Sequence, residues 1–140
     1  MTDPLRALAD REAIRDLACR YADCVWRREV GEAIDLFTDD GVMDMGDRPP
    51  ISGRAALIEA YRAAITGPPF YPFVHNHVID LDGDRASGRC YLDLRCTIDG
   101  RSMTGVGYYD DVYVRRAGQW KFLSRKLNMK HLVPAGQGWD

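Results

Sequence analysis

The second half of the chain limits the possible folds more than any other feature. From residue 70 onward, apolar and polar residues alternate through four stretches, at roughly 71–82, 85–98, 101–116 and 119–132. These stretches are joined by the short links Asp82-Gly83, Asp99-Gly100 and Ala117-Gly118. A two-residue link ending in glycine suits a tight hairpin, because such turns need positive φ angles. The sequence therefore predicts an antiparallel meander.

The first half has the spacing of helices. Apolar residues recur on one helical face at Ile14, Leu17, Ala18, Tyr21 and Val25. Thr2 is a predicted helix cap, and Asp10 is a second one that would mark a break. Helices segregated from an antiparallel sheet predict an α+β domain.

Two shorter helices are expected after the first one. We expect one from Glu32 to Phe37, and another that Ser52 caps and Gly67 ends. Between them, Asp39-Asp40-Gly41 predicts a turn and 42–46 a short strand.

The length, net charge and hydropathy of the chain limit the class of protein it can be. The chain has 140 residues, so we expect one domain over 1–133 with a loose tail over 134–140. The net charge is −2 with both signs interspersed, which predicts no nucleic-acid partner. We find no signal peptide and no apolar run of the roughly 20 residues that span a bilayer. We therefore expect a cytoplasmic protein without a membrane partner.

The cysteines predict no metal site. The chain has four of them, Cys19, Cys24, Cys90 and Cys96. None are spaced like metal ligands, so four reduced thiols are the favoured interpretation.

A curled meander closed by helices would enclose an interior. Alternation places Leu92 and Leu94 on one strand face, and Leu127 and Met129 on one face of the last strand, together with Arg125. A charge in such an apolar row is unfavourable unless it is paired or functional. Arg125 thus has two interpretations, a ligand-facing group or one half of a structural ion pair.

The chain resembles the SnoaL-like part of the NTF2-like superfamily over nearly its whole length. The segments that carry the resemblance are LACRYADCVWRREVGEAIDLFTDDGVMDMG, ISGRAALIEAYRAA, VHNHVIDLDGDRASG and YYDDVYVRRAGQWKFLSRK. The resemblance implies an NTF2-like cone, with three N-terminal helices packed on a curved, mostly antiparallel sheet around a pocket. It also implies no cofactor and a homodimer formed through the outer sheet face.

Catalytic relatives include polyketide cyclases, scytalone dehydratases and ketosteroid isomerases. The dehydratase-like members use an aspartate–histidine dyad, and the resemblance places these two positions at Trp26 and Pro72, so both groups are replaced. The family's strand asparagine and arginine match Asn76 and Arg125, and its helical tyrosine matches Tyr21.

Histidine is the best base available near neutral pH. We take His75 as the candidate base, with Asp23 or Asp44 as a displaced carboxylate. His77 shares the same strand face if the strand is regular, and a bulge would aim either histidine inward. The alternative is that both histidines face solvent or the dimer interface.

These residues define the predicted site. The catalytic candidates are Tyr21, which would polarise an oxygen, His75, which would move the proton, and Arg125, which would stabilise negative charge. The predicted ligand-lining residues are Trp26, Met45, Asn76, Leu92, Leu94, Leu127 and Met129.

Three functions remain open from the sequence. The first is a cofactor-independent dehydratase, isomerase or cyclase that acts on a hydrophobic cyclic compound. The second is a non-catalytic binder of a similar apolar or polycyclic ligand. The third is an accessory or interaction protein with the same fold.

Overall fold

One long helix opens the structure, a computed structural model that describes residues 3–139. Helix α1 (Pro4–Arg27) begins at Asp3, whose carboxylate accepts the Leu5 N–H at 3.0 Å. It ends at Arg28, which adopts a left-handed conformation with φ 58°. The predicted apolar face is buried against the sheet. The predicted break at Asp10 is wrong, and the predicted cap Thr2 lies outside the described residues.

The short elements differ from the prediction at their ends. Helix α2 (Val30–Asp35) stops before Phe37, which begins strand β1 (Phe37–Asp44) because it pairs with Phe122. The predicted turn at 39–41 is therefore an irregular part of β1, where the pairing register shifts. Ser52 belongs to β2 (Ile51–Ser52), and Gly53 is the N-cap of helix α3 (Arg54–Ile65).

The predicted meander is confirmed. It consists of β3 (Phe70–Asp82), β4 (Arg85–Ile98), β5 (Arg101–Arg116) and β6 (Gln119–Pro134). Positive φ angles at Asp99 (51°) and Gly100 (74°), and at Ala117 (51°) and Gly118 (76°), form two of its hairpin turns. The last strand includes Pro134, which was expected in the tail, and the Trp139 ring stacks on His131 at 4.9 Å.

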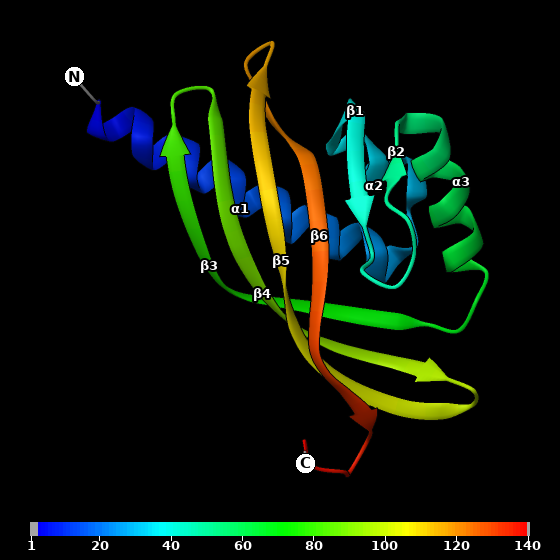
Figure 1. Ribbon diagram of the computed structural model, residues 1–140. Coiled ribbons are helices and arrows are strands. Elements are labelled where there is room, and N and C mark those ends of the chain that lie inside the picture. Colours follow the sequence, from blue (N-terminus) through cyan, green and yellow to red (C-terminus); the bar gives the residue numbers. More distant parts are fainter. Residues whose placement is uncertain (1–2, 140) are drawn as a thin grey trace.

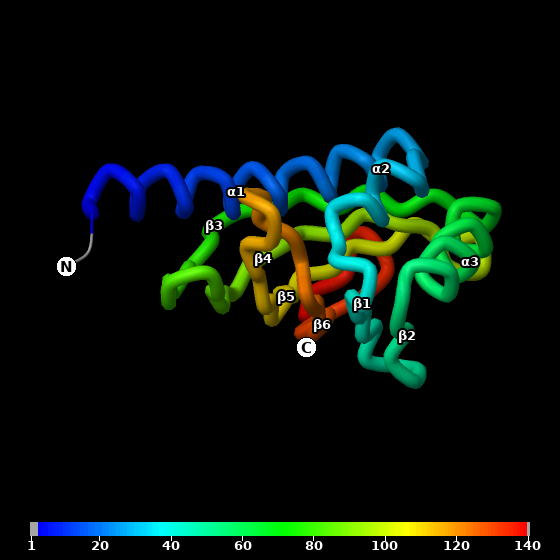
Figure 2. The backbone as a smooth tube through the Cα atoms, turned by 90° about the horizontal axis from the view of Figure 1, so that it is seen from above, coloured from blue at the N-terminus to red at the C-terminus, as the bar shows by residue number. Residues whose placement is uncertain are grey.

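The six strands form one sheet in the order β2-β1-β6-β5-β4-β3. Strand β1 runs parallel to β6, and every other neighbouring pair is antiparallel. Figure 1 shows that the four long strands bend strongly along their length while α1 crosses behind them. Seen from above, α1 and α2 lie along one side of the curled sheet and α3 lies at its β1–β2 end (Figure 2). The chain therefore forms the expected α+β cone.

The core fills the upper part of this cone, between α1 and the sheet. The Tyr21 ring lies edge-on to its neighbours, with centroids 6.1 Å from Phe37, 6.1 Å from Tyr109 and 5.9 Å from Phe122. Leu57 and Tyr61 from α3 close the same core. Among residues 3–139, no helix is long and apolar enough to cross a membrane.

Candidate functional site

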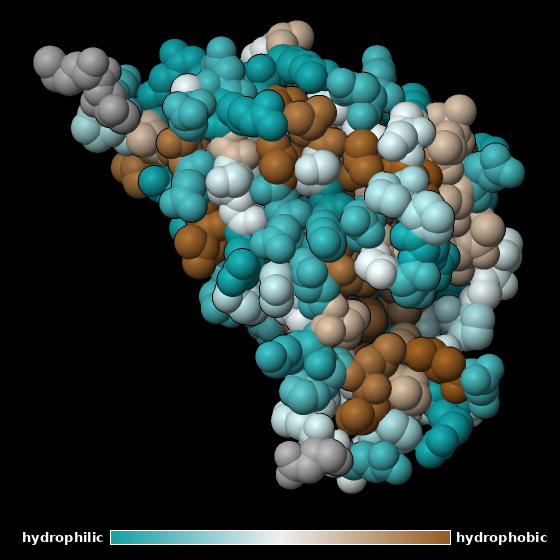
Figure 3. All heavy atoms as spheres, in the orientation of Figure 1, coloured by the Kyte–Doolittle hydropathy of each residue, from teal (hydrophilic) through white to brown (hydrophobic). Residues whose placement is uncertain are grey.

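A cleft of about 920 Å³ opens beside the second half of β6. Pairing between β1 and β6 ends at Asp44 and Lys126, so the edge of β6 beyond Lys126 has no strand neighbour on this side. The β1–β2 connection, the start of β3 and the end of β4 form the other walls. Figure 3 shows a group of apolar side chains at the lower end of this face, with hydrophilic residues around it.

The cleft has an apolar lining and a charged rim. The apolar lining includes Met45, Pro68, Pro69, Phe70, Leu94, Leu127, Met129 and Leu132. The charged residues are Asp47, Arg48, Lys126 and Lys130. Arg48 already pairs with Asp47 at 2.9 Å, so the two lysines supply the remaining positive charge of the rim.

Four of the predicted ligand-lining residues meet in this cleft, namely Met45, Leu94, Leu127 and Met129. The other three lie elsewhere. Leu92 is buried in the core, with 3% of its surface exposed. Asn76 lies at the bulge of β3, and Trp26 packs against Tyr71 and Phe73 on the outside of the cone. The alternation of strand faces was therefore correct, but Leu92 lies too deep in the cone to reach the opening.

Arg125 lies in the sealed interior and not in the cleft. Its guanidinium makes two hydrogen bonds to Asp111, at 2.8 and 3.0 Å, and both side chains are fully buried. The Tyr109 ring lies 3.7 Å from the guanidinium carbon, and the Phe122 and Tyr21 rings lie at 4.3 and 4.6 Å. Of the two interpretations of Arg125, the structure therefore shows the ion pair.

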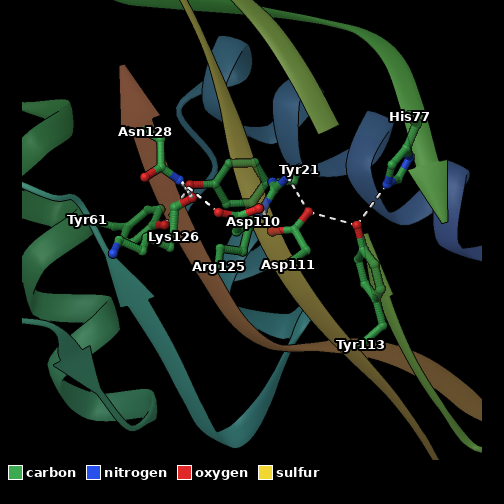
Figure 4. A network of polar contacts seen from close by, with 9 residues as sticks. All are labelled: Tyr21, Tyr61, His77, Asp110, Asp111, Tyr113, Arg125, Lys126 and Asn128. Carbon is green, nitrogen blue, oxygen red and sulfur yellow. Dashed lines mark hydrogen bonds and ion pairs between the residues drawn. The ribbon is translucent and has the colours of Figure 1, made fainter. Parts of the chain in front are cut away.

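The Tyr21 hydroxyl also has its hydrogen-bond partner within the protein. Its hydroxyl lies 2.6 Å from that of Tyr61, and both rings are buried (Figure 4). Burial raises the pKa of both tyrosines above the ordinary value. Both hydroxyls therefore remain protonated near pH 7 and bond to each other rather than to a molecule in the cleft.

The Arg125–Asp111 pair continues into a longer polar chain (Figure 4). The Tyr113 hydroxyl donates to Asp111 at 2.7 Å and also lies 2.7 Å from the Nε2 atom of His77. Burial, opposed by Asp111 and assisted by Arg125, lowers the pKa of His77. Burial lowers the pKa of Arg125 more than any other single cause, but the charge and hydrogen bonds of Asp111, together with Tyr109 and Tyr21, outweigh it and the net shift is upward.

The two histidines do not share a face, because β3 contains a bulge. The pairing register jumps from Val74–Leu92 to His77–Cys90. His75 points outward, with 53% of its side chain exposed, and lies 3.4 Å from Asp93. The structure therefore does not bring His75 together with Tyr21 and Arg125.

Each of the two candidate carboxylates interacts with a residue close to it in the chain. Asp23 pairs with Arg27 on the surface of α1 at 2.9 Å. Asp44 accepts the backbone N–H of Gly46 at 2.9 Å and so stabilises the turn after β1. Neither carboxylate lies beside a histidine in the interactions that the described residues make.

The two positions where the resemblance places the dyad do lie side by side. The Trp26 indole N–H donates to the backbone oxygen of Pro72 at 2.7 Å. The two positions that the resemblance pairs are therefore in contact in the structure. A side chain that could move a proton is absent from both positions, since neither indole nor proline titrates near neutral pH.

The sequence interpretation missed Tyr61, which bonds to Tyr21, and two members of the buried polar chain, Tyr113 and the ion-pair partner Asp111. One signal was present, because alternation places Tyr109, Asp111 and Tyr113 on one face of β5. A carboxylate and an arginine that face the same interior from neighbouring strands are expected to pair. Over residues 3–139 we find no cluster of three or more side chains that could hold a metal ion.

The cone of three helices on a curled sheet, with a cleft beside its last strand, defines an NTF2-like fold. Residues 6–126 match the model of the SnoaL-like domain, so the chain belongs to that family. A search of curated proteins finds no match to the chain.

Solved structures agree with this fold. A hexachlorocyclohexane dehydrochlorinase (LinA type 2) superimposes with a TM-score of 0.88 at 21% identity, covering 99% of this chain and 97% of its own. An NTF2-like protein with a cystatin-like fold from Novosphingobium aromaticivorans gives 0.78 at 23%, covering 96% and 88%. The Kfla4162 protein from Kribbella flavida gives 0.82 at 27%, covering 90% and 94%. At these identities the likeness supports the fold and leaves the activity open.

Proposed function

We propose that this chain binds a small apolar, cyclic molecule in the cleft beside β6, without acid–base chemistry. The cleft volume of about 920 Å³ lies within the range of small-molecule sites, roughly 300–1,000 Å³. Met45 and Met129 supply flexible, polarisable side chains that adapt to a ring system. Lys126 and Lys130 at the rim favour a ligand that carries an acidic group.

One observation carries this proposal. Arg125 is fully buried and already neutralised by Asp111, so it offers no charge to a molecule in the cleft. The Trp26–Pro72 contact occupies the positions where the family's dyad would lie. The cleft therefore keeps an apolar surface for binding, while the groups expected for catalysis serve the protein's own structure.

Calorimetric titration with 2-naphthoate tests the proposal, because this probe combines two fused rings with one carboxylate. We expect saturable binding by the unchanged protein. Met129→Glu places a negative charge on the apolar lining, where it repels the carboxylate of the probe, and is expected to weaken binding about tenfold or more. Leu8→Glu is the matched control, because Leu8 is 63% exposed on α1, away from the cleft.

Two results would overturn the proposal. One is the absence of saturable binding by the unchanged protein, and the other is equal binding by the Met129→Glu and Leu8→Glu variants. The alternative of a dehydratase, isomerase or cyclase makes a different prediction. Turnover of a cyclic hydroxyketone that is abolished by Tyr21→Phe would favour that alternative over a binding protein.

A further inference from the structure

A second, smaller cavity lies on another side of the molecule, between α1 and the bulge of β3. Its volume is about 290 Å³, and it shares no lining residue with the cleft. Its walls are formed by Arg15, Ala18, Cys19, Val74, His75, Asn76, His77 and Cys90. The bulge creates this arrangement, because His75 and Asn76 together lie opposite the single residue Tyr91. The extra residue turns His77 inward, toward Tyr113.

The buried polar chain determines which nitrogen of His77 carries the proton. The Asp111 carboxylate accepts from Arg125 and from the Tyr113 hydroxyl. Since the Tyr113 hydroxyl donates its only hydrogen to Asp111, its oxygen must accept the hydrogen bond from Nε2–H of His77, 2.7 Å away. A neutral imidazole has one N–H, so the Nδ1 atom of His77 is left with a free lone pair.

Burial is the main reason why His77 is neutral near pH 7. The titratable residues that line the cavity with it are Arg15 and Cys19 from α1, His75 from β3 and Cys90 from β4. Behind His77 lie Tyr113 and the ion pair of Asp111 and Arg125. Burial, opposed by Asp111 and assisted by Arg125 and Arg15, lowers the pKa of His77. Burial also raises the pKa of Cys90 to about 11, so that thiol remains protonated.

We propose that this cavity is a second ligand site, which takes a one-ring phenol bearing an acidic group. The phenol hydroxyl donates to Nδ1 of His77, and the acidic group faces the guanidinium of Arg15. Ala18 and Val74 provide apolar wall for the ring. A cavity of about 150 Å³ already holds a benzene ring, so about 290 Å³ has room for one ring with its substituents.

A matched pair of probes tests the hydrogen bond directly. 4-Hydroxybenzoate carries the donor, and 4-methoxybenzoate replaces its proton with a methyl group. We expect calorimetry to show 4-hydroxybenzoate binding about tenfold tighter, the effect of one hydrogen bond to an otherwise unpaired acceptor. Equal affinity for the two compounds, or no binding of either, would overturn the proposal.

Histidine variants locate the site. His77→Phe is expected to abolish the preference for the hydroxyl compound, whereas His131→Phe keeps it, because His131 lies on β6 outside this cavity. Met129→Glu is expected to leave 4-hydroxybenzoate binding unchanged, so the outcome here is independent of the cleft. If His77→Phe does not fold, Arg15→Gln gives the same information, because it should weaken 4-hydroxybenzoate several-fold and leave unsubstituted phenol unaffected.

The proton position can be measured without any ligand. Long-range ¹H–¹⁵N spectra of the unchanged protein at pH 7.5 should show His77 protonated on Nε2 alone. Tyr113→Phe removes the acceptor and should shift His77 toward a mixture of both tautomers. A His77 ring that carries its proton on Nδ1 in the unchanged protein would contradict the proposed acceptor role.

Discussion

The interior of the cone and the cleft beside it share strand β6 but differ in how its side chains are partnered. In the interior, Arg125 is completely buried and its charge is matched by Asp111. Two and four residues further along the same face of β6, Leu127 and Met129 line the open cleft without a polar partner. A charge in a sealed region must be paired, whereas an apolar wall that stays partly exposed is available to a ligand.

The change from one region to the other follows from strand pairing. Strand β1 covers the edge of β6 as far as Lys126 and then turns away at Gly46. Up to that point the helices and β1 seal the interior, and beyond it the edge of β6 is free. The position where β1 ends therefore separates a structural network from a binding surface.

Breaking the buried ion pair should have the largest effect. Asp111→Ala leaves the Arg125 charge without a partner, so we expect the free energy of unfolding to fall by about 3–5 kcal/mol. Urea denaturation measures this loss. Asp110→Ala is the control, because Asp110 is 47% exposed and its change should have little effect. Similar losses in both variants would show that the interior is not sealed as described.

Removing one hydroxyl from the interior should have an intermediate effect. Tyr61→Phe leaves the buried Tyr21 hydroxyl without its partner, and such a loss destabilises by about 1–3 kcal/mol. The midpoint of urea unfolding reports the change. Tyr71→Phe is the control, since Tyr71 is only partly buried. Binding of 2-naphthoate by Tyr61→Phe should remain unchanged if interior and cleft are independent.

Shortening a side chain of the cleft should affect stability less. Met129→Ala removes a partly exposed side chain, so we expect a loss of about 1 kcal/mol, less than the 1.5–3 kcal/mol typical of complete burial. The same variant should weaken 2-naphthoate binding in the titration. A stability loss as large as that of Asp111→Ala would show that Met129 belongs to the core.

The smallest expected effect is a change in the free energy of unfolding with pH, which tests the description of His77. Because burial depresses its pKa, the unfolded chain binds a proton that the folded chain does not, once pH falls below about 6.5. The stability contributed by neutral His77 is therefore present above pH 6.5 and is lost as pH falls toward the folded pKa. Denaturation at pH 7.5 and 5.5 measures the difference. His77→Phe should reduce that difference.

Most of the fold was predictable because its signals are local. Turn pairs such as Asp99-Gly100 specify hairpins, and the alternation around them specifies strand faces. The errors fell where a distant strand decides the conformation. Phe37 leaves the helix because it pairs with Phe122, and the turn expected at 39–41 becomes part of β1 for the same reason.

The site was predictable only in part. Met45, Leu94, Leu127 and Met129 were expected to line the ligand site and meet in one cleft. His75 was chosen as the base on the assumption of a regular strand, and one bulge reversed its direction relative to His77. A bulge depends on the register between β3 and β4, which no single segment encodes.

The sequence by itself determined the α+β meander and the helical apolar face, because each depends on residues close together in the chain. It also indicated the SnoaL-like family, through motifs spread over nearly its whole length. Only the tertiary structure decided that Arg125 is paired with Asp111 in the interior, that Trp26 donates a hydrogen bond to Pro72, and that β1 leaves part of β6 uncovered among the described residues. These features depend on contacts between segments far apart in sequence. The register between paired strands therefore decides whether a given charge or apolar wall is buried or exposed.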